Sequence, residues 1–144
     1  MAEFLNLYRH QFARVAVATP IVRLGDPAHN LEGTLQLMQQ AAEEKAVLAV
    51  FPELGLTAYT LDDLFHQQAV LQAAESALRE LLRRSARLPL AALVGLPVAV
   101  NGLLYNCAAL ACRGRLVGVV PKTYLPNYRE FYEARYFTPG DATP

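Results

Sequence analysis

Apolar residues recur along the first half of the chain in two patterns, short continuous runs and a helical stripe. The runs at residues 13–19 and 46–51 predict buried β-strands. Asp26 followed by Pro27 is typical of a helix N-terminus, where aspartate caps the first turn and proline costs no hydrogen bond. The apolar stripe of the helix that follows consists of Leu31, Leu35, Met38 and Ala42.

The second half begins with another helical stripe and then changes to strands. Apolar residues at helical spacing between 71 and 81 predict a second helix, and Thr60 with Asp63 forms a capping-box-like start for that region. Three apolar runs follow as predicted strands: residues 90–100, 103–112 and 115–120. Asn101-Gly102 between the first two predicts a tight hairpin turn.

The predicted order of elements is strand, helix, strand, helix and then three strands. Strands that alternate with helices favour parallel pairing, and the final three favour an antiparallel meander, so we expect an α/β protein with a mixed sheet. Residues 121–144 have no clear period but are rich in proline and aromatic residues, which predicts an ordered loop region. A length of 144 residues corresponds to one domain or part of one.

Composition narrows the function classes. The chain is 53% hydrophobic and 18% charged with a formal net charge of +0, which is typical of a globular protein and gives no electrostatic footprint for nucleic acid or an anionic membrane. No apolar run approaches the ~20 residues that a membrane-spanning helix needs. Residues 1–10 lack a signal-peptide pattern, and the two cysteines lie in an apolar stretch, so we expect a cytoplasmic location.

Two charged residues directly follow predicted apolar strands. Glu53 comes after the run at 46–51 and Lys122 after the run at 115–120. Functional groups collect beyond the carboxyl ends of strands in open α/β sheets. A poorly solvated glutamate at such a place is suited to act as a general base, and a lysine beside it can stabilise an oxyanion. A solvated surface residue is the alternative interpretation for each.

The remaining chemistry-bearing residues give weaker signals. Cys107 and Cys112 are five positions apart, an odd spacing that would place them on opposite faces of a strand, and we interpret both as small core residues without a disulfide. The histidines show no ligand spacing, so no metal site is expected. The charged and aromatic loop at 127–133 is typical either of a polar small-molecule pocket or of a loop held by its aromatic rings.

Three segments together resemble the nitrilase (carbon-nitrogen hydrolase) superfamily. Residues 51–59, Phe-Pro-Glu-Leu-Gly-Leu-Thr-Ala-Tyr, resemble its general-base motif, and residues 118–125, Gly-Val-Val-Pro-Lys-Thr-Tyr-Leu, resemble its lysine motif. Residues 133–140 resemble the Glu-x-Arg-Tyr-Phe-x-x-Gly element that follows the lysine. The stretch 121–133 and the opening at 8–27 are most similar to the glutaminase domains of glutamine-dependent NAD(+) synthetases.

This resemblance implies the fold, the reaction and the residues that carry it. The fold would be the nitrilase-like α-β-β-α sandwich, of which residues 1–144 would form the N-terminal part. The reaction would be hydrolysis of the glutamine side-chain amide through a cysteine thioester. Glu53 would be the general base and Lys122 the oxyanion stabiliser, while Tyr128, Glu133 and Tyr59 would be substrate-binding residues.

In this superfamily the nucleophilic cysteine lies well beyond the lysine, whereas both cysteines of this sequence precede Lys122. We therefore expect the nucleophile, the rest of the sandwich and the synthetase domain to be missing, and the 144-residue chain to be inactive alone. The amidase part would need no cofactor, and ATP and Mg²⁺ would belong to the missing synthetase domain. The implied partners are glutamine, that synthetase domain of the same polypeptide and further copies in a homo-oligomer. A stand-alone ω-amidase and a non-catalytic nitrilase-like interaction module are the alternatives.

Overall fold

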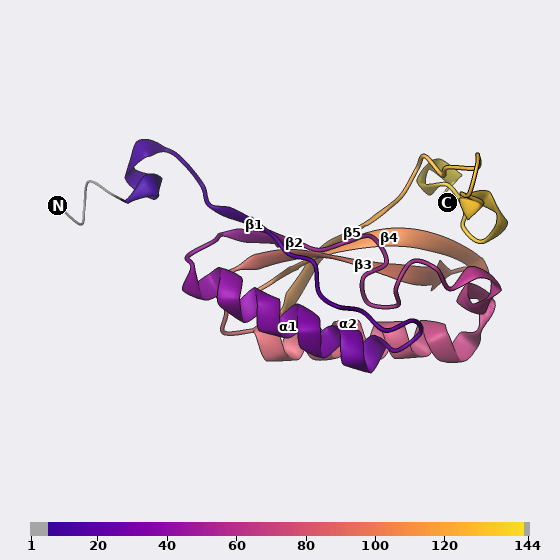
Figure 1. Ribbon diagram of the computed structural model, residues 1–144, viewed down its shortest axis with the longest axis horizontal. Helices are drawn as coiled ribbons and strands as arrows, with labels where there is room; N and C mark the ends of the chain where they lie inside the picture. The colour runs from indigo at the N-terminus through magenta and orange to yellow at the C-terminus, as the bar shows by residue number, and fades with distance from the viewer. Residues whose placement is uncertain (1–5, 143–144) are drawn as a thin grey trace.

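The computed structural model describes residues 6–142, which form one mixed five-stranded sheet with two α-helices (Figure 1). The strands are β1 (Val15–Val17), β2 (Leu48–Val50), β3 (Ala91–Val100), β4 (Leu103–Cys112) and β5 (Arg115–Pro121), and the helices are α1 (Pro27–Glu43) and α2 (Gln68–Ser85). Short 3₁₀ helices span Leu7–His10, Asp62–His66, Glu133–Arg135 and Gly140–Ala142. The order in the sheet follows the chain, with β1–β2–β3 parallel and β3–β4–β5 antiparallel. The predicted mixed sheet is confirmed.

The β3–β4 hairpin is the longest ladder of the sheet. It runs in register from Ala91 opposite Cys112 to Val100 opposite Leu103. Asn101 and Gly102 close it with φ angles of 51° and 79°, the left-handed conformation that a two-residue turn between twisted strands requires. The predicted hairpin turn is therefore confirmed, and β4 lies between β3 and β5 in the sheet.

Helices α1 and α2 cover one face of the sheet (Figure 1). The Asp26 carboxylate caps α1 by accepting a hydrogen bond of 3.0 Å from the His29 N–H, as the sequence predicted. The helices and alternate strand positions form a core that includes Leu35, Met38, Leu78, Leu81, Ala92, Val94, Leu96 and Ala109. Within residues 6–142, no helix is long and apolar enough to cross a membrane.

The predicted helix start at Thr60 is wrong. Asp62 has a φ of 51°, a left-handed conformation that interrupts any α-helix running through it. A 3₁₀ turn follows, and α2 begins only at Gln68. The side chain of Asp63 is used elsewhere, since its carboxylate accepts two hydrogen bonds from Arg135 at 2.7 and 2.8 Å. Asp63 thus anchors the C-terminal loops through Arg135 instead of capping a helix.

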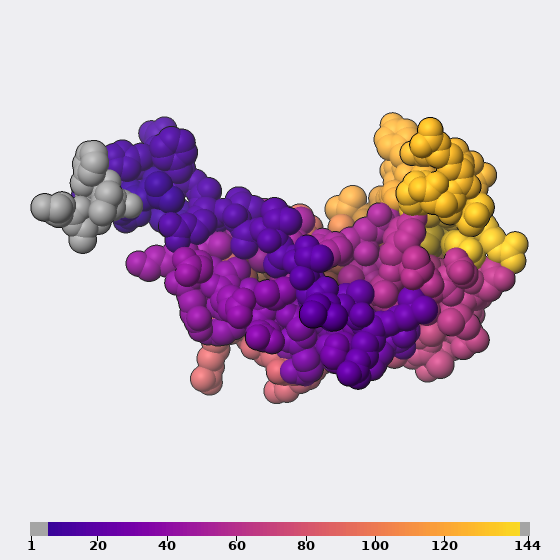
Figure 2. All heavy atoms as spheres, in the orientation of Figure 1, coloured from indigo at the N-terminus to yellow at the C-terminus, as the bar shows by residue number. Residues whose placement is uncertain are grey.

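The opposite face of the sheet is apolar and carries no helix in the described part of the chain. Val17 on β1 is 84% exposed, and on β4 and β5 the paired Ala108 and Val120 are both exposed. On β2, which the sequence predicted to be covered on both faces, Val50 is only half-buried. The N-terminal and C-terminal segments rise at the two ends of this face, and a hollow lies between them (Figure 2).

Candidate active site

The loop after β2 carries Glu53 across the edge of β3. The Phe51 N–H donates to the Leu93 carbonyl at 3.0 Å, and the Leu56 N–H donates to the Gly95 carbonyl at 3.1 Å. Between these anchors, Leu54 adopts a φ of 51° and is fully buried. The loop is therefore fixed at both ends, and Glu53 projects from its middle.

Gly95 on β3 makes this close approach possible. A Cβ atom at this position would lie 2.3 Å from the Leu54 nitrogen and 2.7 Å from the Pro52 carbonyl oxygen. Both distances are shorter than van der Waals contact, so any larger residue must push the backbone on either side of Glu53 away from the sheet. Only glycine allows the two backbones to touch here.

Lys122 lies at the exit of β5 and brings two carboxylates together. Its main-chain N–H donates to the Asn106 carbonyl of β4 at 2.8 Å. Its ammonium donates to Glu53 Oε1 at 2.6 Å and to Glu133 Oε1 at 2.9 Å. Residues far apart in the sequence thus meet at one cation, although β2 and β5, which precede Glu53 and Lys122, are not adjacent in the sheet.

Glu133 is the most buried charged residue of this cluster. Its side chain is 4% exposed, and its Oε1 accepts a second hydrogen bond of 2.6 Å from the Tyr59 hydroxyl. Within residues 6–142, its other oxygen is buried without a hydrogen-bond partner. Burial, followed by the hydrogen bond to Glu133, raises the pKa of Tyr59, so Tyr59 stays a neutral donor.

Glu53 and Glu133 keep the Lys122 side chain protonated. Partial burial lowers its pKa, but the hydrogen bonds and charge attraction from Glu53 and Glu133 outweigh this effect, and the net pKa is raised above the usual lysine value. Lys122 is therefore a permanent cation near neutral pH. It can stabilise negative charge but cannot act as a base.

Two further sequence-predicted residues differ in their placement. Tyr59 points at Glu133, and its ring contacts Phe131 edge-on at a centroid distance of 6.4 Å. Tyr128 contacts the other side of this aromatic group, 5.9 Å from the Phe131 ring, and is itself 64% exposed. The structure thus joins Tyr59 directly to the charged cluster, whereas Tyr128 lies at its solvent-exposed rim.

Asn106 is a member of the cluster that the sequence analysis did not identify. It is buried on β4, and its carboxamide nitrogen donates to Glu53 Oε1. It is the single carboxamide in the apolar run of residues 103–112, and that contrast was the available signal. A polar side chain inside an apolar strand needs a partner, and here the partner is the predicted base.

A cavity of about 350 Å³ opens beside these groups on the helix-free face. Its polar end is formed by Glu53, Asn106 and Lys122, and its apolar lining includes Val50, Leu93, Gly95, Ala108 and Val120. Cys107 also borders it. The cavity has the size and the mixed lining of a small-molecule site.

Cys107 is poorly suited to nucleophilic attack. It is 5% exposed, and burial raises the pKa of its thiol to about 11. Because the thiolate is the reactive form, we expect iodoacetamide to alkylate native Cys107 ~100-fold more slowly at about pH 8 than in the urea-unfolded chain. Peptide mass spectrometry over time measures this rate, with Cys112 as the internal comparison. Equal alkylation rates in the folded and unfolded states would contradict a buried, poorly reactive Cys107 thiol.

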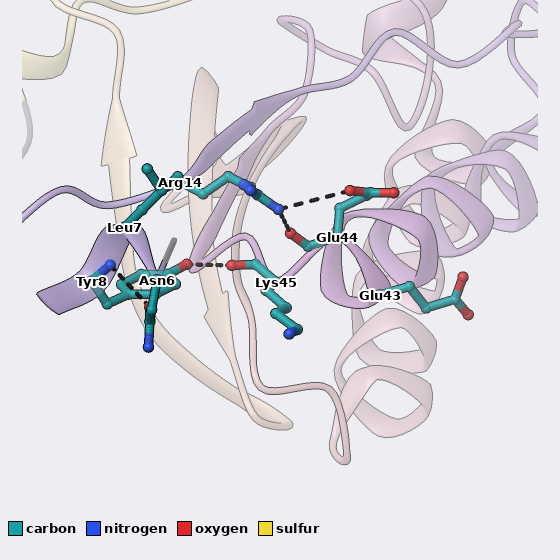
Figure 3. Close-up of a pocket in the computed structure, with 7 residues that line it drawn as sticks. All are labelled: Asn6, Leu7, Tyr8, Arg14, Glu43, Glu44 and Lys45. Carbon is teal, nitrogen blue, oxygen red and sulfur yellow. Dashed lines mark hydrogen bonds and ion pairs between the residues drawn. The ribbon is translucent and has the colours of Figure 1, made fainter. Parts of the chain in front are cut away.

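A second cavity, of about 420 Å³, lies at the other end of the molecule and shows no comparable chemistry (Figure 3). There the Arg14 guanidinium donates to the Glu44 carbonyl, and the Tyr8 hydroxyl donates to the Lys45 carbonyl. These hydrogen bonds satisfy carbonyl groups at the C-terminal end of α1. The cavity is therefore explained by the attachment of the N-terminal segment to α1.

Residues 14–144 match the protein family described as carbon-nitrogen hydrolase. The chain belongs to this family. Over 138 residues, 96% of its length, it is 44% identical to the glutamine-dependent NAD(+) synthetase of Mycobacterium tuberculosis (strain H37Rv), of which those residues make up 20%. This carbon-nitrogen hydrolase chain thus spans about a fifth of the length of the curated relatives it matches.

Solved structures support the same assignment. A glutamine-dependent NAD(+) synthetase from Cytophaga hutchinsonii matches with a TM-score of 0.83 and 28% identity over 88% of this chain and 22% of that one. An amidase from Nesterenkonia sp. matches with a TM-score of 0.73 and 28% identity over 89% of this chain and 48% of that one. A further structure of this amidase shows acrylamide added at its active-site cysteine. The predicted nitrilase-like fold, present as part of its domain, is confirmed.

Proposed function

We propose that this carbon-nitrogen hydrolase chain supplies the base and the oxyanion-stabilising cation for hydrolysis of the glutamine side-chain amide. It would do so as the glutaminase part of a glutamine-dependent NAD(+) synthetase. The observation that carries the proposal is the pair of hydrogen bonds from the Lys122 ammonium to Glu53 and Glu133. The 44% identity to proteins of that name supports the choice of substrate.

In the proposed reaction, the Glu53 carboxylate takes the proton of a cysteine thiol while the sulfur attacks the amide carbon. The charge that develops on the amide oxygen is stabilised by Lys122, which is already positioned and charged. Collapse of the tetrahedral intermediate transfers the proton to the departing nitrogen, breaks the C–N bond and releases ammonia. Glu53 then takes a proton from water as the water oxygen attacks the thioester carbon. The C–S bond breaks, the proton passes from Glu53 to the departing sulfur, and glutamate and the free thiol are released.

We propose that neither Cys107 nor Cys112 is the nucleophile, since Cys112 ends β4, six positions beyond Asn106. On β4 the side chain of Asn106 reaches Glu53, and adjacent strand residues point to opposite faces, so Cys107 points away from the base. Cys107 lies on the same face of β4 as Ala109 and Ala111, which pack in the helix-covered core. We therefore propose that a further cysteine, as in the Nesterenkonia amidase, approaches Glu53 from the helix-free face.

Glutamine hydrolysis tests this proposal. We expect the 144-residue chain alone to release no ammonia from glutamine above the buffer rate, and the longest polypeptide that its gene encodes to release it. Cys107→Ala and Cys112→Ala should each leave that rate within about 2-fold, because neither thiol reaches the base. Measurable hydrolysis by the 144-residue chain that is lost on Cys107→Ala would contradict the assigned nucleophile.

A stand-alone amidase is the second candidate, favoured by the match to the Nesterenkonia enzyme. It would use the same base and cation on a small aliphatic amide. Parallel assays with glutamine, propionamide and deamido-NAD plus ATP separate the two functions. Ammonia transfer to deamido-NAD supports the synthetase, whereas hydrolysis of propionamide alone supports the amidase. Binding without any hydrolysis would support a non-catalytic module.

The remaining parts of the proposal concern the surroundings of the site. Residues 6–142 contain no group of three or more histidine, cysteine or acidic side chains placed to hold a metal ion. We propose that ATP and Mg²⁺ act in a synthetase domain and that amide hydrolysis needs neither. We also propose a homo-oligomer in the cytoplasm, where reduced thiols such as the free Cys107 and Cys112 persist.

A further inference from the structure

We propose that Asn106 is a positioning residue that holds both the base and the cation of this site in place, an inference that rests on the proposed function. Its side chain binds Glu53 and its main chain binds Lys122. One buried residue thus fixes two candidate catalytic groups that come from different loops.

The geometry at Glu53 shows what the carboxamide does. Both donors, Asn106 Nδ2 and Lys122 Nζ, bind the same carboxylate oxygen, Oε1. Two hydrogen bonds to one oxygen fix the plane of the carboxylate and therefore the direction of Oε2. Oε2 takes part in neither bond, so it is the atom available to take the nucleophile's proton.

Asn106 is well placed for this role because it is more buried than the groups it holds. Its exposed fraction is 3%, against 41% for the Glu53 side chain and 29% for the Lys122 side chain. It lies on β4, which is paired on both sides, with β3 and β5. A buried neighbour that locks the rotamer of a partly exposed catalytic group is the usual means of preorganising a site.

The neutral charge of Asn106 matters as well. Glu53 and Glu133 share a single ammonium, so a carboxylate at position 106 would compete for Lys122, and a cation there would draw Glu53 away from Lys122. A carboxamide donates a hydrogen bond without altering this balance of charge. The side chain can therefore orient Glu53 while leaving Lys122 to both glutamates.

The test uses the longest polypeptide that the gene encodes, with glutamine as substrate. We expect Asn106→Leu, a near-isosteric loss of the donor, to lower kcat ~100-fold while KM stays within ~3-fold, because the base is misdirected but the pocket is kept. In Glu53→Asp the shorter carboxylate no longer reaches Asn106. Asn106→Leu should therefore cause no further loss in that background, since the two changes remove the same interaction.

Thr34→Val is the matched control, a near-isosteric polar-to-apolar change at a buried residue of α1 whose hydroxyl donates to the Asn30 carbonyl. It should leave kcat unchanged. The contrary outcome is a double variant that loses kcat by the product of the two single losses. In that case Asn106 has only a structural role and the inference is overturned, while the proposed function stands.

A second measurement separates this inference from the proposed function. In the 144-residue chain, the side-chain amide NMR signals of Asn106 should shift on Glu53→Gln, because a charged acceptor is replaced by a neutral one. If the gene product hydrolyses no glutamine, the proposed function fails, and this shift alone decides the positioning role. Unmoved Asn106 side-chain signals would overturn it.

Discussion

Replacing Lys122 with methionine is expected to lower kcat for glutamine hydrolysis by ~10²- to 10³-fold, because it removes the cation that stabilises the developing oxyanion. The same change leaves the buried Glu133 carboxylate without its ammonium partner. Loss of one partner of a buried ion pair costs about 3 kcal/mol of unfolding free energy. Steady-state kinetics on the gene's full polypeptide and urea unfolding of the 144-residue chain measure the two effects.

The chain offers a matched control for this variant. Lys45 is the other lysine of the sequence, it is exposed, and no carboxylate is within ion-pair distance of it in the described residues. Lys45→Met should therefore leave kcat unchanged and alter the unfolding free energy by less than about 0.5 kcal/mol. Equal losses in the two variants would show that the effect comes from lysine removal in general and not from this site.

Gly95→Ala is expected to destabilise the chain by about 3 kcal/mol and to lower kcat, because the new methyl group overlaps the backbone of the loop that carries Glu53. Side-chain rotation cannot relieve a contact of 2.3 Å with a backbone nitrogen. The loop must therefore move away from β3, and Glu53 moves with it. Urea denaturation gives the loss of stability, and kinetics on the full polypeptide give the loss of rate.

Gly118→Ala provides the comparison, since a Cβ atom there would have no atom within 4 Å. We expect its unfolding free energy to stay within about 0.5 kcal/mol of the parent value. Gly95 and Gly118 both lie in strands, so the difference between the variants isolates the contact with the loop. A Gly95→Ala chain as stable as Gly118→Ala would contradict the close approach of loop and sheet.

Much of the architecture could be predicted from the sequence because the apolar pattern carried it. The strands of the β3–β4 hairpin were placed to within one residue, since their apolar runs are long and Asn101-Gly102 fixes the turn between them. Glu53 and Lys122 were each expected at the exit of an apolar strand, and the structure brings them together from β2 and β5. The catalytic roles of these residues stay predictions.

Other features depend on contacts that sequence spacing does not encode. The start of α2 was misplaced because the left-handed turn at Asp62 is stabilised by distant partners, among them Tyr136, whose hydroxyl donates to Asp62 at 3.2 Å. Asn106 was overlooked because its role needs a loop 53 residues away in the sequence. The function of Gly95 likewise appears only when a second backbone is placed against it.

The short turn of the β3–β4 hairpin has a consequence for the order of folding. Antiparallel strands joined by two residues can pair within microseconds. The parallel pairings of β1 with β2 and of β2 with β3 are slower, because each must first close a connection that contains a whole helix. Gly95 and Asn106 lie in the hairpin, but Glu53 follows the parallel strand β2. We therefore expect the β3–β4 hairpin to form early in folding. The loop that carries Glu53 should pack against it in a late step.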